Sequence, residues 1–395
     1  MIDLMALILI SSAAIQPPHW SLEREFRLGS VDDSVYALSF VTGLTIGEDG
    51  RIYVNQGIDR SIRVFDANGR YIRTLGGPGD GPGQFRSLGS AWWRADTLYV
   101  FDHDLQRAVL FDTAGRVLDT RAWTPPDVPF PLRPTIPLAL LSNGTGIIRP
   151  SSAFDPRNDA EASSIPILRA DMNGHILDTL AILPPIEARM IRGGTRMAIH
   201  AQAFPRDPVV RATPAGDRVF IVDYPASRDS RDDVVRIRAF DVGGQLIYER
   251  QHAFPGIPIP RRVADSTYAE AVKRLSAALQ IGGRQAEDLA RSTYPVPESY
   301  PPVSTAVPSS DGSIWLAKWS NDDESRLWYI IDSQGNFVAE ARTPPRTTLR
   351  FIQDGKAWGI ERDELDVPFV VRYRVGSTAR RNQTGLDSRR RSPSS

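Results

Sequence analysis

Polar side chains recur at one register position of an internal repeat, at the end of the second of its four predicted short strands. Three of them are carboxylates, Asp102, Asp223 and Glu361, and Gln56 and Lys318 take the same place in two other copies. Carboxylate oxygens are the ligands that Ca²⁺ prefers in proteins. If the runs form one ring of strands, these carboxylates could hold a divalent cation near its opening and serve a metal-dependent hydrolase or lyase.

The same residues have a structural interpretation, which we favour. An Asp at the end of a strand caps the loop that follows it and pairs with the arginine that opens the next strand. This would join Asp102 to Arg107 and Asp223 to Arg236. The five histidines occupy non-equivalent places in the repeat, so a zinc site built from several of them is not expected. They are His19, His103, His175, His200 and His252.

Two further side chains near the same opening are candidate ligand contacts. His103 lies in the loop between the second and third predicted strands of one copy, and Trp319 follows Lys318 in another. A loop tryptophan can stack on a sugar or a peptide, whereas Trp315, Trp328 and Trp358 lie within strand patterns and are predicted core residues. The full set of candidate ligand-binding residues is Gln56, Asp102, His103, Asp223, Lys318, Trp319 and Glu361.

Composition excludes several kinds of site. The chain of 395 residues contains no cysteine, which removes disulfides, thiolate metal ligands and cysteine nucleophiles. Its 47 Lys and Arg balance its 47 Asp and Glu, so a nucleic-acid-binding face is not expected. The sequence has no phosphate-binding glycine loop and no nucleophile elbow. No apolar stretch approaches the roughly 20 residues that span a bilayer.

The candidate residues are positioned by a repeat with five clear copies. Each copy has a turn with Gly, an apolar run, a polar loop, a second run that ends in Asp, then x-x-Gly and a third run. With the apolar stretch that precedes it, such as residues 41–46, each copy supplies four short strands. Repeated four-stranded sheets in a ring form a β-propeller. The five aspartates that end the second run are Asp66, Asp112, Asp171, Asp241 and Asp332.

A sixth, weaker unit over residues 354–373 lacks the Asp-x-x-Gly turn and the third run. The alternating segment 22–28 would supply its missing outer strand and close the ring, which removes exposed sheet edges. We therefore predict an all-β fold: a six-bladed β-propeller of four-stranded blades over residues 20–376, closed by the N-terminal strand. A partly helical insertion over residues 254–302 would lie between blades 4 and 5.

A glycine-rich linker supports this architecture. Gly77-Pro78-Gly79-Asp80-Gly81-Pro82-Gly83-Gln84-Phe85, with the Tyr-Val…Phe-Asp-x-x-Gly spacing, resembles the NHL-repeat proteins, most clearly in the first two units. The resemblance implies a six-bladed propeller but no single function, because this fold hosts binding modules, lyases and lactonases. Gluconolactonase-like propellers surround a divalent cation with Glu, Asn and Asp; the resembling residues here would be Asp102, Asp223 and Glu361.

Long insertions are predicted to gather on one face of the ring. In a four-stranded antiparallel blade, the loop between strands two and three shares a face with the link to the next blade, and extra length on one face is typical of a binding face. Thr267-x-x-Glu270 predicts the start of a helix that Gly282-Gly283 ends, followed by a second helix over 284–291. The apolar stripe of the first helix would rest on the channel mouth, so the insertion would act as a lid. The insertions are residues 124–133, 150–164, 184–208, 224–233 and 254–302.

The two ends of the chain differ from its body. Residues 1–16 resemble an export signal, with an apolar run before small residues, which predicts a periplasmic or extracellular location. Residues 377–395 are rich in Arg and Ser and are predicted to be a disordered tail.

The sequence thus predicts an exported, NHL-like propeller that binds a peptide, glycan or protein partner on its insertion-bearing face without catalysis. This role needs no cofactor. The alternative is a gluconolactonase-like, metal-dependent hydrolase or lyase with Ca²⁺ or another divalent cation at the channel mouth.

Overall fold

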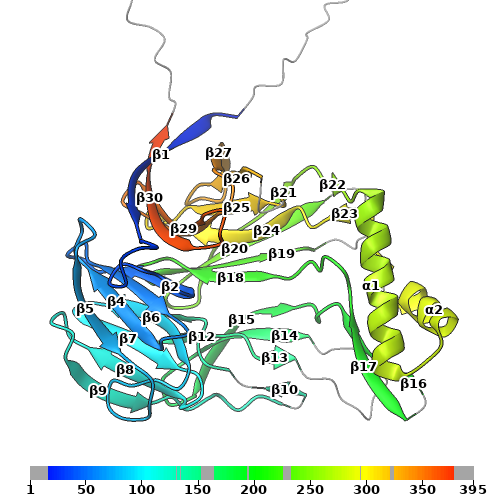
Figure 1. Ribbon diagram of the computed structural model, residues 1–395, viewed down its shortest axis with the longest axis horizontal. Coiled ribbons are helices and arrows are strands. Elements are labelled where there is room, and N and C mark those ends of the chain that lie inside the picture. Colours follow the sequence, from blue (N-terminus) through cyan, green and yellow to red (C-terminus); the bar gives the residue numbers. More distant parts are fainter. Residues whose placement is uncertain are drawn as a thin grey trace, which may run out of the picture.

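Small antiparallel sheets, arranged side by side around a common centre, make up most of the protein (Figure 1). The computed structural model describes residues 17–129, 131–133, 135–152, 164–193, 195–225, 233–293, 295–320 and 324–377. The predicted export signal at 1–16 and the predicted tail, apart from its first residue, lie outside these ranges. Among the described residues, no helix is long and apolar enough to cross a bilayer.

Four of the sheets have four strands each, and within each sheet the strands pair in chain order. The first two sheets are β2(Val41–Ile46), β3(Ile52–Gln56), β4(Ser61–Phe65), β5(Tyr71–Gly76), and β6(Leu88–Arg94), β7(Thr97–Asp102), β8(Arg107–Phe111), β9(Val117–Ala122). The third and fourth are β11(Ala139–Leu140), β12(Gly146–Ile148), β14(Ile165–Ala170), β15(Ile176–Leu183), and β18(Val209–Ala212), β19(Arg218–Asp223), β20(Val234–Asp241), β21(Leu246–Ala253).

A fifth sheet has eight strands and contains both ends of the described chain. Its order is β24(Val303–Pro308), β25(Ile314–Lys318), β26(Arg326–Ile331), β27(Phe337–Thr343), β1(His19–Leu28), β30(Pro368–Ser377), β29(Lys356–Arg362), β28(Thr347–Gln353). Strand β1 pairs antiparallel with β30 from Trp20 to Leu28, but it meets β27 in parallel at only two residue pairs. The sheet therefore consists of two four-stranded halves, and the N-terminal strand completes the second half, as the sequence predicted.

The remaining elements lie in the connections. The two-stranded pairs are β10(Leu132–Arg133) with β13(Ser151–Ser152), β16(Ala188–Gly193) with β17(Arg196–Ala201), and β22(Ile257–Pro258) with β23(Ser299–Tyr300). Two helices, α1(Arg261–Leu279) and α2(Gly283–Thr293), lie between β21 and β24.

The first strand of each four-stranded unit lies innermost. Contacts join these strands in succession: β2 with β6, β6 with β11, β18 with β24, and β24 with β28. Apolar side chains fill the layers between neighbouring sheets; Val222, Ile237 and Leu316, for example, pack together between the fourth sheet and β24–β27. The strand tryptophans Trp315, Trp328 and Trp358 are buried, which confirms their predicted core role.

The five Asp-x-x-Gly segments of the sequence repeat form the same turn. In the first sheet, Oδ1 of Asp66 accepts hydrogen bonds from the backbone N–H groups of Asn68 at 2.9 Å and Arg70 at 2.8 Å. Gly69 has φ +84°, a left-handed conformation that side-chain-bearing residues avoid. The carboxylate and the glycine together set the turn locally. Equivalent turns begin at Asp112, Asp171, Asp241 and Asp332.

One histidine links two neighbouring sheets and makes their contact sensitive to pH. Nε2 of His252 in β21 lies 2.9 Å from the carbonyl oxygen of Gly335, before β27, and burial lowers the pKa of His252 below its ordinary value. The unfolded chain therefore takes up this proton more readily than the folded protein does. The free energy of unfolding should be highest above about pH 6.5 and should fall as the pH drops below it. Urea titrations at several pH values should show a weaker fall for His252→Gln; an identical pH profile for both proteins would contradict this assignment.

Two sequence predictions about the helices are wrong. Helix α1 begins at Arg261, with Pro260 at its N-cap and no side-chain cap, so Thr267-x-x-Glu270 lies inside the helix. The β22–β23 pair runs up to this point, since the N–H of Ile259 still donates to the carbonyl oxygen of Glu298 at 2.9 Å. The chain leaves the pair directly before the helix. The apolar stripe of α1 packs on β17 and α2 rather than on the channel mouth. It therefore forms part of a separate small core and is not a lid.

Candidate functional site

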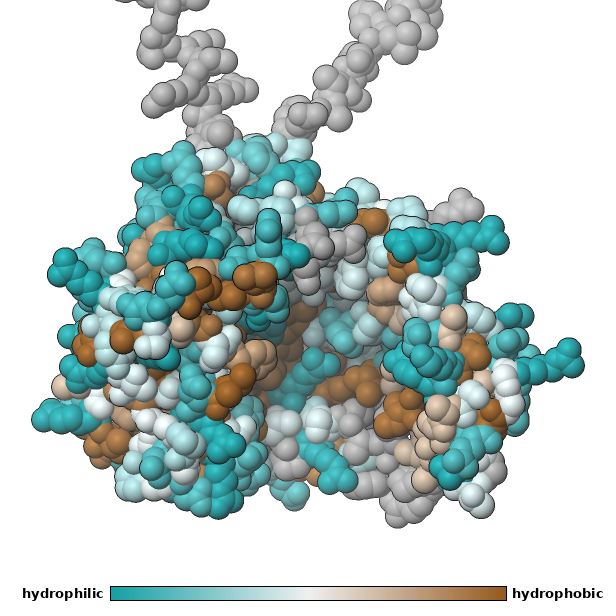
Figure 2. Space-filling model, in the orientation of Figure 1, coloured by the Kyte–Doolittle hydropathy of each residue, from teal (hydrophilic) through white to brown (hydrophobic). Residues whose placement is uncertain are grey.

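The two longest insertions meet and form one unit. The β16–β17 hairpin lies in the link between the third and fourth sheets, and α1 and α2 lie in the next link. Ile191 of the hairpin packs with Leu275 and Leu279 of α1 and with Ala286 of α2. We call β16, β17, α1 and α2 the insertion unit. Figure 2 shows the molecular face hollowed between the sheets on the left and the helices on the right.

The hairpin presents an apolar face that α1 does not use. Its cross-strand pairs alternate, so Ile191 and Ala198 turn toward the helices while Met190 and Ile199 turn the other way. Met197 and Ile199 are 52% and 61% exposed. Exposed apolar side chains of this size on a two-stranded hairpin are suited to contact with another molecule.

Three aromatic rings gather where the insertions join the sheets. Trp319, just after β25, stacks on Tyr300 of β23 with ring centroids 4.8 Å apart and planes inclined by 10°. Phe204, in the link after β17, meets both rings edge-on, with centroids at 4.9 Å from Tyr300 and 5.7 Å from Trp319. Phe204 has φ +52°, an uncommon backbone conformation outside glycine. Phe204 and Trp319 are only partly buried, so the aromatic trio offers ring surface to solvent.

A buried ion pair fixes the link that carries Phe204. Nη2 of Arg206 lies 2.7 Å from Oδ1 of Asp233, and each of the two side chains is 9% exposed. The backbone N–H of Arg206 donates to Oε2 of Glu187 at 3.1 Å, and its guanidinium lies 5.7 Å from the ring centroid of Tyr224. These contacts tie the insertion unit to the loop before β20 and hold the aromatic trio in place.

Of the predicted site residues, Asp223 has the most enclosed environment. Its carboxylate is fully buried and accepts hydrogen bonds from Nε of Arg236 at 2.9 Å and from Nη2 of Arg238 at 3.0 Å. The predicted pairing with Arg236 is confirmed, and the hydrogen bond to Asp223 raises the pKa of Arg236. Two guanidinium groups occupy the oxygens that a cation would need.

Asp102 is equally buried but uses other partners. It accepts backbone N–H hydrogen bonds from Arg86 at 2.9 Å, Ser87 at 3.2 Å, Asp104 at 3.0 Å and Leu105 at 3.1 Å. The predicted pairing of Asp102 with Arg107 is not what the structure shows. Arg107 instead donates to the carbonyl oxygens of the glycine-rich linker, because that linker folds back beside β8.

Gln56 and Glu361 likewise support neighbouring segments. Oε1 of the buried Gln56 accepts hydrogen bonds from the N–H of Ser39 at 2.8 Å and from its hydroxyl at 3.0 Å. Glu361 pairs with Arg24 at 2.8 Å and Arg27 at 3.1 Å, which anchors β1 to β29. Lys318 is half-buried at the end of β25.

His103 is exposed and lies over the inner strand β6. A Cβ atom built on Gly89 would lie 2.8 Å from Cδ2 of this imidazole, so the ring occupies the space that the glycine leaves. His103 therefore covers the inner edge of the second sheet, beside Asp102.

The three carboxylates of the predicted cation site are engaged by other donors in the structure. Asp102, Asp223 and Glu361 each bind donors within their own sheet or loop, and the described residues contain no group of three His, Asp or Glu that could hold a metal. A divalent cation near Asp223 would also face the positive charges of Arg236 and Arg238.

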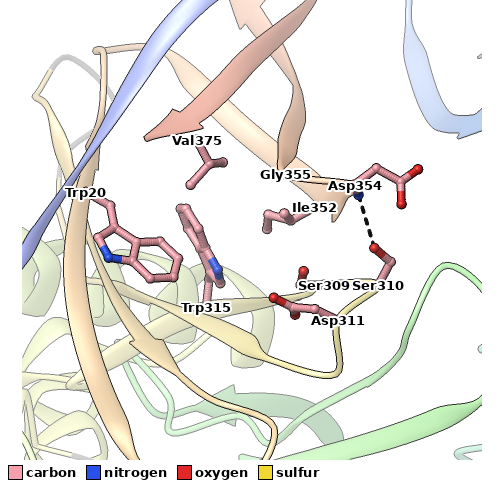
Figure 3. A pocket seen from close by; sticks show the side chains of 9 residues that line it. All are labelled: Trp20, Ser309, Ser310, Asp311, Trp315, Ile352, Asp354, Gly355 and Val375. Atoms are coloured by element: carbon pink, nitrogen blue, oxygen red, sulfur yellow. Dashed lines mark hydrogen bonds between the residues drawn. The ribbon is translucent and has the colours of Figure 1, made fainter. Parts of the chain in front are cut away.

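A pocket of about 300 Å³ lies on the face opposite the insertion-bearing one (Figure 3). There, turns of the two halves of the eight-stranded sheet meet β1. Trp20 and Trp315 form one wall, with ring centroids 6.0 Å apart. Its polar groups are used within the turns: Ser310 accepts the N–H of Asp354 at 3.1 Å, and Asp311 accepts that of Ser313 at 2.9 Å. Burial alone would raise the pKa of Asp311, but its hydrogen bonds hold that pKa below the ordinary value. The sequence does not predict this pocket, because its lining comes from segments far apart in the chain.

Sequence and structure comparisons give information about the fold. No protein-family profile matches the chain, and no curated protein matches it in sequence. It resembles the structure of a DUF4221-family member from Bacteroides vulgatus, with 10% identity and a TM-score of 0.53 over 92% of this chain and 99% of that one. Two weaker likenesses are to a protein from Bacteroides fragilis described as exported and to the calcium-binding protein regucalcin from Agrobacterium tumefaciens. The first has 13% identity and a TM-score of 0.46 over 90% of this chain and 96% of that one. The second has 14% identity and a TM-score of 0.41 over 90% of this chain and 96% of that one.

These identities are too low to transfer an activity, so they concern the fold alone. The DUF4221 likeness covers nearly the whole of both chains, and the small sheets have their first strands side by side around a centre. Both observations lead to the same conclusion: the chain folds as a β-propeller.

Proposed function

We propose that this protein is an exported, six-bladed, NHL-like β-propeller that binds a peptide, glycan or protein partner on its insertion-bearing face without catalysis. The six blades are the four separate four-stranded sheets and the two halves of the eight-stranded sheet. Strand β1 takes the place of the outer strand in the sixth blade. Export rests on the signal predicted over residues 1–16.

The observation that carries the proposal is the aromatic trio of Phe204, Tyr300 and Trp319. Partly exposed, mutually supported rings are typical of the anchors of binding interfaces, because they offer large contact areas with little loss of conformational freedom. The apolar side chains Met197 and Ile199 are exposed on the insertion unit, which the link carrying Phe204 joins to the fourth sheet. A face that combines rigid rings with exposed apolar groups favours a macromolecular or sugar ligand over a buried small substrate.

The predicted polar residues divide into two groups in this proposal. Lys318, Trp319 and His103 remain accessible and are proposed ligand contacts. Gln56, Asp102, Asp223 and Glu361 are proposed to act indirectly, by holding the loops that carry the face. The engagement of Asp102, Asp223 and Glu361 with arginines and backbone N–H groups supports binding over metal-dependent hydrolysis.

We expect arrays of peptides and glycans to yield ligands whose affinity depends on Trp319. Trp319→Ala should weaken such binding at least about tenfold, since removal of a central aromatic anchor costs more than about 1.4 kcal/mol. The matched control is Phe337→Ala, which removes a partly exposed ring at a turn on the opposite face. Ligands that bind both variants equally, or that respond only to Phe337→Ala, would contradict the proposed face. Hydrolysis of a lactone or ester that requires a divalent cation would support the alternative enzyme instead.

A further inference from the structure

Two arginines on innermost strands lie at the same depth of the ring. Arg211 of β18 pairs with Phe220, three residues before Asp223 at the end of β19. Arg350 of β28 falls between the pairs Leu349–Gly359 and Phe351–Trp358, opposite the middle of β29 and two to three residues before Glu361. Both sites therefore lie about 10 Å from the insertion-bearing ends of the second strands, at 3.3 Å per residue.

Both side chains are exposed although buried residues lie beside them on their strands. Val210 and Ala212 pack in the core between the third and fourth sheets, so strand alternation turns Arg211 to the other side of β18, the side of Val209. Val209 is partly buried there, whereas Arg211 is exposed. Arg350 is the extra residue of a β-bulge between the buried Leu349 and Phe351, and a bulge re-aims the side chain that it carries. Strand β24 contacts both β18 and β28, so the two arginines flank one inner strand.

The two side chains reach solvent inside the protein rather than on its outer surface. Both are exposed, yet the largest influence on each guanidinium is desolvation by the surrounding protein, which lowers the pKa of Arg211 and of Arg350. The positive charges of Arg350 and Arg149 lower the pKa of Arg211 further. Exposed side chains on the innermost strands face the channel at the centre of the ring, so Arg211 and Arg350 bring positive charge there.

No carboxylate balances this charge in the part of the chain that the structure describes. Nη1 of Arg211 donates to the carbonyl oxygen of Val210 at 2.9 Å, and Nη1 of Arg149 donates to that of Pro208 at 3.3 Å. Among the described residues, neither Arg211 nor Arg149 has an acidic partner, and Arg350 has no hydrogen-bond partner. A guanidinium has five N–H donors and stays protonated at neutral pH, so most donors of this arginine cluster remain available.

We infer that the channel binds an oxyanion, the phosphate or carboxylate group of a small ligand, between Arg211 and Arg350 with Arg149 beside them. A guanidinium fork matches the paired oxygens of either group. The bound negative charge would offset the mutual repulsion of the three arginines. This site is distinct from the aromatic trio and goes beyond the proposed function, which it neither requires nor replaces.

The test measures thermal unfolding of the full chain at constant ionic strength in sodium phosphate, sulfate, succinate or chloride. A ligand that binds only the folded protein raises the midpoint. If the site takes phosphate groups, phosphate and sulfate should raise the unfolding midpoint by at least about 3 °C relative to chloride. If it takes carboxylate groups, succinate should do so instead. Equal midpoints in all four salts would overturn the inference.

Substitutions separate this site from general salt effects. Arg350→Gln and Arg211→Gln should abolish the anion-dependent rise, and each should leave the midpoint in chloride unchanged or higher, because repulsion is removed. The control is Arg70→Gln, which alters an exposed arginine in the β4–β5 turn and should respond to the anion like the unmodified protein. An equal anion response in Arg350→Gln, Arg211→Gln and the unmodified chain would contradict the site.

If a glutamine variant does not fold, Arg350→Lys keeps the charge but loses the planar fork, and calorimetry with the responding anion should show at least tenfold weaker binding. Unchanged affinity in that variant would count against Arg350 as a ligand. Loss of the anion response should leave the Trp319-dependent array binding intact, so the two proposals fail separately.

Discussion

Removal of residues 17–28, which include β1, is expected to abolish cooperative folding. Strand β1 supplies the outer strand beside β30 over register pairs that run from Trp20–Ser377 to Leu28–Val370. Leu28 is 4% exposed and packs with Val370 and Trp358, and Trp20 contacts Trp315. Loss of one buried leucine, several half-buried side chains and a row of backbone hydrogen bonds exceeds about 5 kcal/mol, the lower range of total domain stability.

The deletion would also expose the facing edges of β30 and β27, which favours aggregation. Circular dichroism, urea unfolding and gel filtration should therefore show loss of the cooperative transition and association of the shortened chain. A peptide of residues 17–28 added in trans should restore part of the transition. A deletion variant that unfolds at nearly the same urea concentration as the intact chain would show that β1 is not a structural strand.

Two point variants separate the effect of packing from that of surface charge. Leu28→Ala should destabilise the protein by about 2–5 kcal/mol, since it creates a cavity in the core. Glu23→Ala removes an exposed carboxylate that pairs with Arg374 on the same strand pair and should change stability by less than about 1 kcal/mol. Similar losses for the two variants would contradict the burial of Leu28.

Replacement of Asp223 by alanine is expected to cause the second large loss of stability. The side chain of Asp223 is 1% exposed and lies against Arg236 and Arg238, which are themselves largely enclosed. Removing this carboxylate leaves two guanidinium groups uncompensated, so we expect a loss of about 3–5 kcal/mol in the free energy of unfolding. Asp104→Ala, which alters an exposed carboxylate beside Asp102, should change it by less than about 0.5 kcal/mol.

The same pair of variants tests the cation alternative. If Asp223 only balances the two arginines, Ca²⁺, Mg²⁺ and Zn²⁺ should not raise the unfolding midpoint of the intact chain, and Asp223→Ala/Arg238→Leu should recover part of the stability lost in Asp223→Ala. A rise with one cation that disappears in Asp223→Ala would instead identify Asp223 as a metal ligand.

The sequence by itself predicted the features that depend on local chemistry. An Asp-x-x-Gly turn closes through hydrogen bonds over four residues and a single left-handed glycine, so its five copies could be read without any tertiary contact. Strand alternation over 22–28 and the incomplete sixth unit together predicted where β1 pairs. The pairing of Asp223 with Arg236 could be predicted because the two residues lie directly opposite on adjacent strands. Asp102 and Arg107 are opposite in the same way, but Arg107 binds the glycine-rich linker instead.

Contacts between distant segments were decided only by the tertiary structure. Helix α1 begins at Arg261 and packs on β17 because the preceding strand pair and the hairpin meet it in space, and a local capping pattern carries no information about either. Two of the four backbone donors to Asp102 come from residues 86 and 87, because the glycine-rich linker folds back there. Arg149, Arg211 and Arg350 lie far apart in the sequence and converge only when the innermost strands surround one channel, since through-space electrostatics depends on that closure and not on spacing along the chain.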